Sequence, residues 1–188
     1  MRPEVLLFDV NETLLDVKAL APRFTAAFGN ADLLPDWFGL LLRYSLEVTV
    51  TGDYRPFDEL AVGALVTSAA RADMPIDLDE ATALVDAMSE MPAHPDVASG
   101  LEQLKSAGFR LATLTNSRPD VAIDQLKYAS IDGYFEAALS VESVGRFKPH
   151  PDTYVYAADT LGVPIERCTL VAAHDWDCLL YTSPSPRD

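Results

Sequence analysis

Cysteine, histidine and basic residues are scarce in this sequence, and each shortage excludes a class of protein. There are 2 cysteines and 3 histidines, with no CxxC pair and no clustered His/Cys set. We therefore expect neither a disulfide framework nor a structural zinc site. Lys and Arg number 14 against 29 Asp and Glu, which leaves a formal net charge of −15. A chain this acidic repels nucleic acid and anionic membrane surfaces.

Long apolar runs are also missing. No stretch is long enough to span a bilayer, and the N-terminus lacks the basic and apolar regions of a secretory signal. We therefore expect a cytoplasmic protein with no membrane partner. Apolar residues nevertheless make up 49% of the 188 residues. That share suffices for a sizeable core in one domain, or in one domain that carries an insert.

The last residues, 178–188, break the pattern of the rest and form a Ser/Pro-rich end. We interpret them as a translated sequencing adapter, because a DNA string resembling a common transposase adapter encodes them in order; the alternative is an ordinary tail. On this interpretation Cys168 is the one native cysteine, and residue 177 is natively Asp or Glu. The natural core then continues beyond the fragment, whose unpaired sheet edge we expect to promote aggregation and loss of activity.

The body of the sequence begins with a strand pattern and ends in an alternation of strands and helices. The apolar run 5–8 is typical of a strand buried on both faces of a parallel sheet. Further along, strands are expected at 110–115, 137–140 and 169–173, and helices at 96–107, 119–129 and 152–161. Such alternation predicts an α/β fold with a parallel sheet wound on both sides.

Residues 15–92 show no strand pattern and predict an all-helical insert. The segment 37–50 is strongly apolar and indicates a buried helix, and 57–71 has helical spacing. Asp77, with Glu80 three residues later, resembles a capping box that opens one more helix.

Four polar clusters follow the predicted strands or lie on loops beside them. They are Asp9, Thr115-Asn116-Ser117, Lys148 and His174-Asp175-Trp176-Asp177. Each alone has an ordinary explanation, such as a helix cap for Asn116 or Ser117, or a solvated loop residue for Lys148. Right-handed crossovers, however, bring all strand ends to one edge of the sheet, where such folds bind ligands. Together the clusters favour a site in which Asp9 is a nucleophile.

The ordered segments FDVNETLLD, TLTNS, GRFKPHPDTY and VAAHDWD resemble the four motifs of the haloacid dehalogenase superfamily of hydrolases. The type II 2-haloacid dehalogenase branch is the most similar. The resemblance implies a Rossmann-like parallel-sheet core with an inserted helical cap. Its parts would be residues 1–14 and 93–177 for the core, truncated at its C-terminus, 15–92 for the cap, and 178–188 for a non-native tail.

The resemblance also implies roles for individual residues. Asp9 would form a covalent ester with a substrate carbon, and Lys148 would keep that carboxylate ionised. Asp177 would help to position or activate the water that hydrolyses the ester. Thr115 and Asn116 would bind the substrate, a small carboxylate, by hydrogen bonds. The remaining substrate contacts would be Asn11, Phe38, Tyr154 and His174.

Departures from the family pattern bear on the substrate. Phosphatases of the superfamily carry an aspartate where this chain has Asn11, and an amide cannot protonate a leaving alkoxide. They also place a magnesium-binding aspartate at the position of Ala173. Dehalogenases place an arginine where this chain has Phe38. Arg43 lies five positions further, about 140° around a helix, and is no obvious substitute.

These departures leave three functions open. A 2-haloacid dehalogenase, with no metal and no cofactor, is the leading one, because halide leaves without protonation. A magnesium-dependent small-molecule phosphatase is the first alternative. A non-catalytic homologue that binds small acids is the second, motivated by Phe38 and Asn11. The resemblance also leaves a homodimer open.

Overall fold

The computed structural model describes residues 2–177, so the expected adapter at 178–188 lies outside the described residues. A parallel sheet forms the centre of the fold. Its strands are β1 (Val5–Phe8), β2 (Arg110–Thr115), β3 (Ala137–Ser140) and β4 (Cys168–Val171). Their order is β3-β2-β1-β4 and every pairing is parallel. The apolar strand β1 is central and fully buried, as its unbroken apolar pattern predicts.

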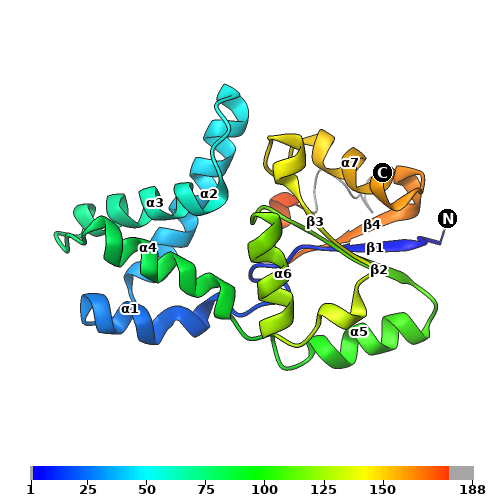
Figure 1. Ribbon diagram of the computed structural model, residues 1–188, viewed down its shortest axis with the longest axis horizontal. Coiled ribbons are helices and arrows are strands. Elements are labelled where there is room, and N and C mark those ends of the chain that lie inside the picture. Colours follow the sequence, from blue (N-terminus) through cyan, green and yellow to red (C-terminus); the bar gives the residue numbers. More distant parts are fainter. Residues whose placement is uncertain (1, 178–188) are drawn as a thin grey trace.

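Helices cover the sheet and also form a separate group beside it (Figure 1). The α-helices are α1 (Ala21–Phe28), α2 (Leu33–Thr51), α3 (Phe57–Arg71), α4 (Leu78–Asp86), α5 (Val97–Ser106), α6 (Pro119–Tyr128) and α7 (Pro151–Leu161). In Figure 1, α7 lies on one face of the sheet and α5 on the other, while α1 to α4 stand together at its side. The α/β class and the helical nature of the inserted segment are therefore as predicted.

Local sequence signals explain where several helices begin and end. Asp77 is the N-cap of α4, and its side chain accepts a hydrogen bond from the Glu80 backbone nitrogen at 2.9 Å. Gly108 follows α5 with a φ of 86°, and Gly162 ends α7 with a φ of 68°. Left-handed backbone of this kind costs glycine little and stops a helix from continuing.

The side helices have an aromatic core of their own. The Trp37 side chain of α2 is fully buried, and its indole nitrogen donates to the Ala61 carbonyl of α3 at 2.8 Å. Its ring also lies 5.2 Å from that of Phe24 in α1, centroid to centroid. One expectation fails here, because α2 is not a wholly buried helix. Its buried residues form one face and end at Ser45, and Val50 near its end is 88% exposed.

The last strand ends earlier than the sequence pattern predicts. We expected a strand over 169–173, whereas β4 spans Cys168–Val171. Instead of extending the ladder, the Ala173 backbone nitrogen donates to the Thr13 hydroxyl at 2.9 Å. The chain after β4 is therefore tied to the loop that follows β1. In the part of the chain that the structure describes, no helix combines the length and apolarity that crossing a membrane requires.

Candidate active site

The register of the strands brings the polar clusters together at the carboxyl edge of the sheet. Phe8 of β1 pairs with Thr113 of β2 and with Val171 of β4, so these strands end close to one another at the carboxyl edge of the sheet. The side chains that follow at this edge are Asp9, Asn116 and His174. This is the arrangement that the alternating pattern predicts for a parallel sheet.

Lys148 is buried between two carboxylates. Its Nζ lies 2.8 Å from Asp9 Oδ1 and 2.7 Å from Asp177 Oδ2. Burial alone would lower the pKa of the Lys148 ammonium, but the charges of Asp9 and Asp177 outweigh it, and the pKa lies above its ordinary value. Lys148 is therefore a fixed positive charge against Asp9. The structure thus brings together the three residues that the sequence selects as catalytic.

Thr13 completes the fixation of Asp9 and was missing from the predicted site. Its hydroxyl donates to Asp9 Oδ2 at 2.7 Å, while Lys148 holds the other oxygen. Thr13 lies 4 positions after Asp9 in sequence, and a hydroxyl residue this close to the candidate carboxylate is the signal that could have indicated it. Because both oxygens of Asp9 have partners, the carboxylate is held in one orientation at the edge of the sheet.

The two predicted site residues at the end of β2, Thr115 and Asn116, make different hydrogen bonds. The Thr115 hydroxyl accepts from the Ser117 backbone nitrogen at 3.1 Å, so its role in this structure is to shape the turn. Asn116 accepts from the Lys148 backbone nitrogen at 3.1 Å. Asn116 therefore couples the turn after β2 to the loop that carries the buried lysine, and its side chain also borders the cavity at Asp9.

Asn11 is engaged by protein groups at both ends of its amide. Gln125 of α6 donates to its Oδ1 at 3.0 Å, and its Nδ2 donates to the Ser117 hydroxyl at 3.3 Å. Gln125 also donates to the Met88 carbonyl at 3.0 Å. The amide therefore links the loop after β1 to α6 and to the last residues of the side helices, and it offers no titratable proton.

A small cavity of about 10 Å³ opens beside Asp9. Its lining consists of Asp9, Asn11, Phe38, Leu42, Phe57, Asn116, His174 and Trp176. The structure thus assembles helices α2 and α3 with the strand ends around Asp9. Of these residues, sequence reasoning missed Leu42 and Phe57, which are apolar positions on helices and carry no distinctive signal, and it placed Trp176 in the last polar cluster without giving it a role.

Two predicted residues have specific surroundings. Phe38 stacks on His174, with ring centroids 6.5 Å apart and an interplanar angle of 22°. Tyr154 lies outside the lining of the cavity, and its hydroxyl donates to Asp177 Oδ1. Tyr154 therefore contacts the buried cluster of Asp9, Lys148 and Asp177 through a hydrogen bond to Asp177, while Phe38 lines the cavity.

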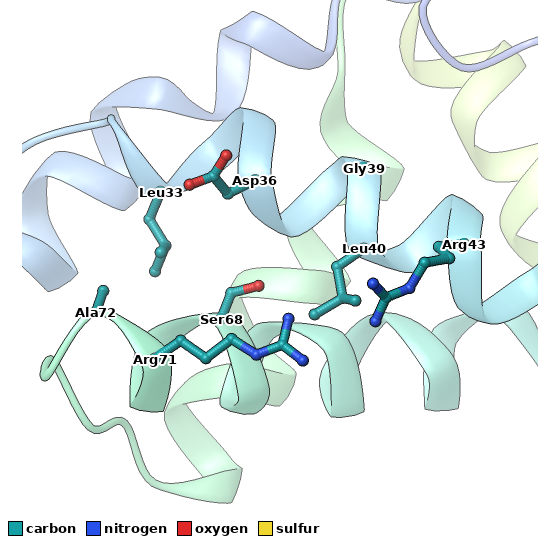
Figure 2. Close-up of a pocket in the computed structure, with 8 residues that line it drawn as sticks. All are labelled: Leu33, Asp36, Gly39, Leu40, Arg43, Ser68, Arg71 and Ala72. Atoms are coloured by element: carbon teal, nitrogen blue, oxygen red, sulfur yellow. The ribbon is translucent and has the colours of Figure 1, made fainter.

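Arg43 takes no part in this cavity. It lines a separate groove of about 460 Å³ between α2 and α3, together with Arg71 (Figure 2). Its guanidinium pairs with Glu47 one turn further along α2, at 3.1 Å. Arg43 lies about 140° around α2 from Phe38. Phe38 and Leu42 therefore line the cavity with Asp9, whereas Arg43 lines the other groove.

The acidic residues near Asp9 are committed to the buried lysine. Among the described residues there is no group of three or more His, Cys, Asp or Glu side chains placed to hold a metal ion. The position at which the family's phosphatases carry an additional aspartate is Ala173, which contributes only its backbone nitrogen to Thr13. The donor set at this site therefore does not fit a magnesium ion.

Comparisons with known proteins agree with this geometry. A family model described as haloacid dehalogenase-like hydrolase matches residues 3–178. The (S)-2-haloacid dehalogenase 4A of Burkholderia cepacia is 32% identical over 91% of this chain and 75% of its own length. The haloacetate dehalogenase H-2 of Moraxella sp. is 27% identical over 93% of this chain and 79% of its own length.

Solved structures show the same relationship. The L-2-haloacid dehalogenase of Xanthobacter autotrophicus, with chloropropionic acid covalently bound, superposes with a TM-score of 0.88 at 26% identity. The match covers 93% of this chain and 71% of that one. The motif order, the fold, the buried Asp9–Lys148–Asp177 cluster and these matches lead to one conclusion: this chain is an enzyme of the haloacid dehalogenase-like hydrolase family.

Proposed function

We propose that this chain is a cytoplasmic hydrolase that converts small 2-haloacids into 2-hydroxyacids, with Asp9 as the nucleophile. The observation that carries the proposal is the fixation of both Asp9 oxygens, by Lys148 at 2.8 Å and by Thr13 at 2.7 Å, at the edge of the cavity. The family relationship and the dehalogenase names of the similar proteins support the choice of substrate.

In the first step, Asp9 attacks the carbon that bears the halogen. A carbon–oxygen bond forms, the carbon–halogen bond breaks, and the halide leaves with the bonding electron pair. Lys148 places its positive charge 2.8 Å from the attacking carboxylate and holds one of its oxygens. The ester on Asp9 is then opened by water, which releases the hydroxyacid and restores the carboxylate.

The surroundings of Asn11 support a halide rather than a phosphate ester as the leaving group. Phosphate ester hydrolysis requires a proton for the leaving alkoxide, and general acid catalysis is worth about 10²–10⁴-fold. The amide of Asn11 has no such proton and is held by Gln125 and Ser117. A halide is a weak base and leaves without one.

We further propose that α1 to α4, within residues 15–92, act as a cap over the core formed by 1–14 and 93–177. The cavity of about 10 Å³ has room for roughly one water molecule, so a haloacid requires the two parts to separate before it can enter. The Asp58–Arg118 ion pair, at 3.3 Å, joins α3 to the loop before α6 and would open in that movement.

Halide release from 2-chloropropionate tests the proposal. Because we interpret residues 178–188 as adapter, the assay protein carries the continuation that the gene encodes after codon 177, established by sequencing across that codon. We expect release by the wild-type protein and none by Asp9→Asn. Asp159→Asn, an exposed carboxylate on α7, is the matched control and should retain activity.

Two results would contradict this function. One is an absence of halide release by wild type from either enantiomer, and the other is undiminished release by Asp9→Asn. Magnesium-dependent hydrolysis of p-nitrophenyl phosphate by the wild-type protein would instead support the phosphatase alternative. Tight binding of small acids without turnover would support the binding homologue.

A further inference from the structure

The loop that carries Lys148 is held from both parts of the molecule. On the side of the core, Asn116 Oδ1 accepts from the Lys148 backbone nitrogen at 3.1 Å. On the side of the cap helices, the Thr49 hydroxyl of α2 accepts from the Phe147 backbone nitrogen at 3.0 Å. Two successive backbone nitrogens of this loop therefore have their partners on different parts, and 98 positions of sequence separate Thr49 from Phe147.

Thr49 makes a second contact with the same loop. Arg146 Nη1 donates to the Thr49 carbonyl oxygen at 3.2 Å. Thr49 lies in the last turn of α2, which ends at Thr51. Carbonyl groups in the last turn of a helix have no partner within the helix, and a positive charge beside them interacts favourably with the helix dipole. Arg146 supplies both the donor and the charge, so the end of α2 is fixed to the residues directly before Lys148.

The Phe147 side chain is enclosed by residues of the cap. It is fully buried, and its ring stacks on that of Tyr54 with centroids 4.9 Å apart and an interplanar angle of 27°. The ring of Phe57, the first residue of α3, lies 5.7 Å away. Phe57 also lines the cavity at Asp9. The residue that precedes Lys148 in the backbone is therefore packed against the same segment of the cap that borders the candidate site.

Thr51 shows what a threonine at a helix end ordinarily does. Its hydroxyl donates to carbonyl groups of its own helix, those of Glu47 at 3.0 Å and Val48 at 3.3 Å. The Thr49 hydroxyl instead accepts from the backbone of the loop at Phe147. Of these two threonines in one turn, Thr49 therefore acts on the loop of Lys148, and Thr51 acts on α2.

The placement of Lys148 leaves little tolerance. Its Nζ lies 2.8 Å from Asp9 Oδ1 and 2.7 Å from Asp177 Oδ2. A displacement of about 1 Å would lengthen these contacts beyond hydrogen-bonding distance, and a misplacement of that size can lower a reaction rate by about 10²-fold. A residue that fixes the backbone beside Lys148 therefore affects the reaction without touching the substrate.

We propose that Thr49 is a positioning residue, which holds Lys148 against Asp9 from the cap through the backbone of Phe147; this inference rests on the proposed function. The arrangement of Lys148 and Asp9 then depends on the contact between the cap and the core. Replacement of Thr49 by valine, which has nearly the same shape, leaves the Phe147 nitrogen facing a methyl group. A partly buried donor without an acceptor is costly, so the loop moves to find another partner.

The experiment compares wild type, Thr49→Val and Thr49→Ser in the chain with its natural continuation. The rate of the first halide release from saturating 2-chloropropionate is measured by rapid mixing, per folded molecule. We expect this rate to fall by about 10- to 10²-fold in Thr49→Val. Thr49→Ser keeps the accepting oxygen and should restore most of the rate. The substrate concentration that half-saturates the rate should stay close to that of wild type, because Thr49 lies outside the lining of the cavity.

Thr51→Val is the matched control, because it makes the same substitution in the same turn and removes bonds only within α2. It should release halide like wild type. Arg146→Met tests the contact from the side of the loop and should lower the rate in the same direction by a smaller factor. If Thr49→Val does not fold, Arg146→Met decides: a lowered rate supports the inference and an unchanged rate overturns it.

Three outcomes would overturn the inference while the proposed function stands. The first is an unchanged rate in folded Thr49→Val, since a contact that only stabilises the fold lowers the urea midpoint and not this rate. The second is an equal loss in Thr49→Ser, and the third is an equal loss in Thr51→Val. Failure of the wild-type protein to release halide removes the proposed function itself. Amide hydrogen exchange at Phe147, which should rise in Thr49→Val and not in Thr51→Val, would then still test the fixation of the loop.

Discussion

Lys148 Nζ contacts Asp9 Oδ1 at 2.8 Å across 139 positions of sequence. The same ammonium contacts Asp177 Oδ2 at 2.7 Å, and all three side chains are almost completely buried. Burial of one cation with two carboxylates is tolerable only while all members are present, because each supplies the partners that water no longer provides. Removal of one member should therefore be costly to stability, and under the proposed function it should also impair the reaction.

Replacement of Lys148 by Met should lower both the stability of the fold and the rate of halide release. Two buried carboxylates would lose their shared cation, so we expect the free energy of unfolding to fall by about 3–5 kcal/mol. Halide release should also be lost. Urea denaturation and the halide assay measure the two effects. Lys127→Met, an exposed lysine on α6, should change stability by less than about 0.5 kcal/mol, and equal losses in both variants would contradict the role of the cluster.

Asn11→Asp should not create a phosphatase. The new carboxylate keeps the hydrogen bond from Gln125 but cannot donate to Ser117, and the residue is only 6% exposed. The Ser117 hydroxyl can instead donate to the new carboxylate, so we expect a loss of about 1–3 kcal/mol in the free energy of unfolding from placing a charge at this buried position. Hydrolysis of p-nitrophenyl phosphate with magnesium should stay at background. Strong magnesium-dependent activity would show that one residue decides between the reactions.

Tyr54→Phe should reduce sensitivity to alkali. The ring of Tyr54 stacks on Phe147 at 4.9 Å, and its hydroxyl is buried with no hydrogen-bond partner among the described residues. Burial, followed by the charges of Glu142 and Asp58, raises the pKa of the Tyr54 hydroxyl from 10.0 to about 12.

The sign of the effect follows from this shift. The unfolded state loses the phenolic proton first, so the contribution of Tyr54 to stability is complete below pH 10 and is lost as the pH rises towards 12. Wild type should therefore lose more stability than Tyr54→Phe between these values. At pH 8 the two should be similar, because the hydroxyl has no bond to lose. Urea midpoints at pH 8 and pH 11 measure this, and parallel losses would contradict it.

Arg118→Gln should loosen the closed arrangement without unfolding the protein. Its guanidinium lies 3.3 Å from Asp58 of α3 and joins the cap helices to the core. Because both side chains are partly exposed, the pair is worth no more than about 1 kcal/mol to stability. Amide hydrogen exchange should rise at the start of α3 and near Arg118.

The matched control for this variant is Arg55→Gln, whose partner Asp53 lies in the same cap segment at 3.7 Å. It breaks a comparable pair without separating the cap from the core, so exchange near Arg118 should stay as in wild type. Equal exchange in the two variants would contradict the prediction that the Asp58–Arg118 ion pair holds the cap helices against the core.

Local sequence patterns determined the elements of this fold. The apolar run of β1, the capping residue Asp77 and the left-handed glycines after α5 and α7 act within a few residues of themselves. The order of the four polar motifs also placed Asp9, Lys148 and Asp177 at one sheet edge, because parallel strands with right-handed crossovers end on the same side.

Only the tertiary structure decided how those side chains are paired. The hydrogen bonds of Asn11 to Gln125, the contact of Glu12 with His174 and the stacking of His174 on Phe38 join residues from different elements. No local periodicity encodes such contacts, since they depend on how the helices α2 and α6 pack against the strand ends. For the same reason the sequence selected Asp9 as a candidate nucleophile, and only packing showed that both oxygens of Asp177 have hydrogen-bond partners.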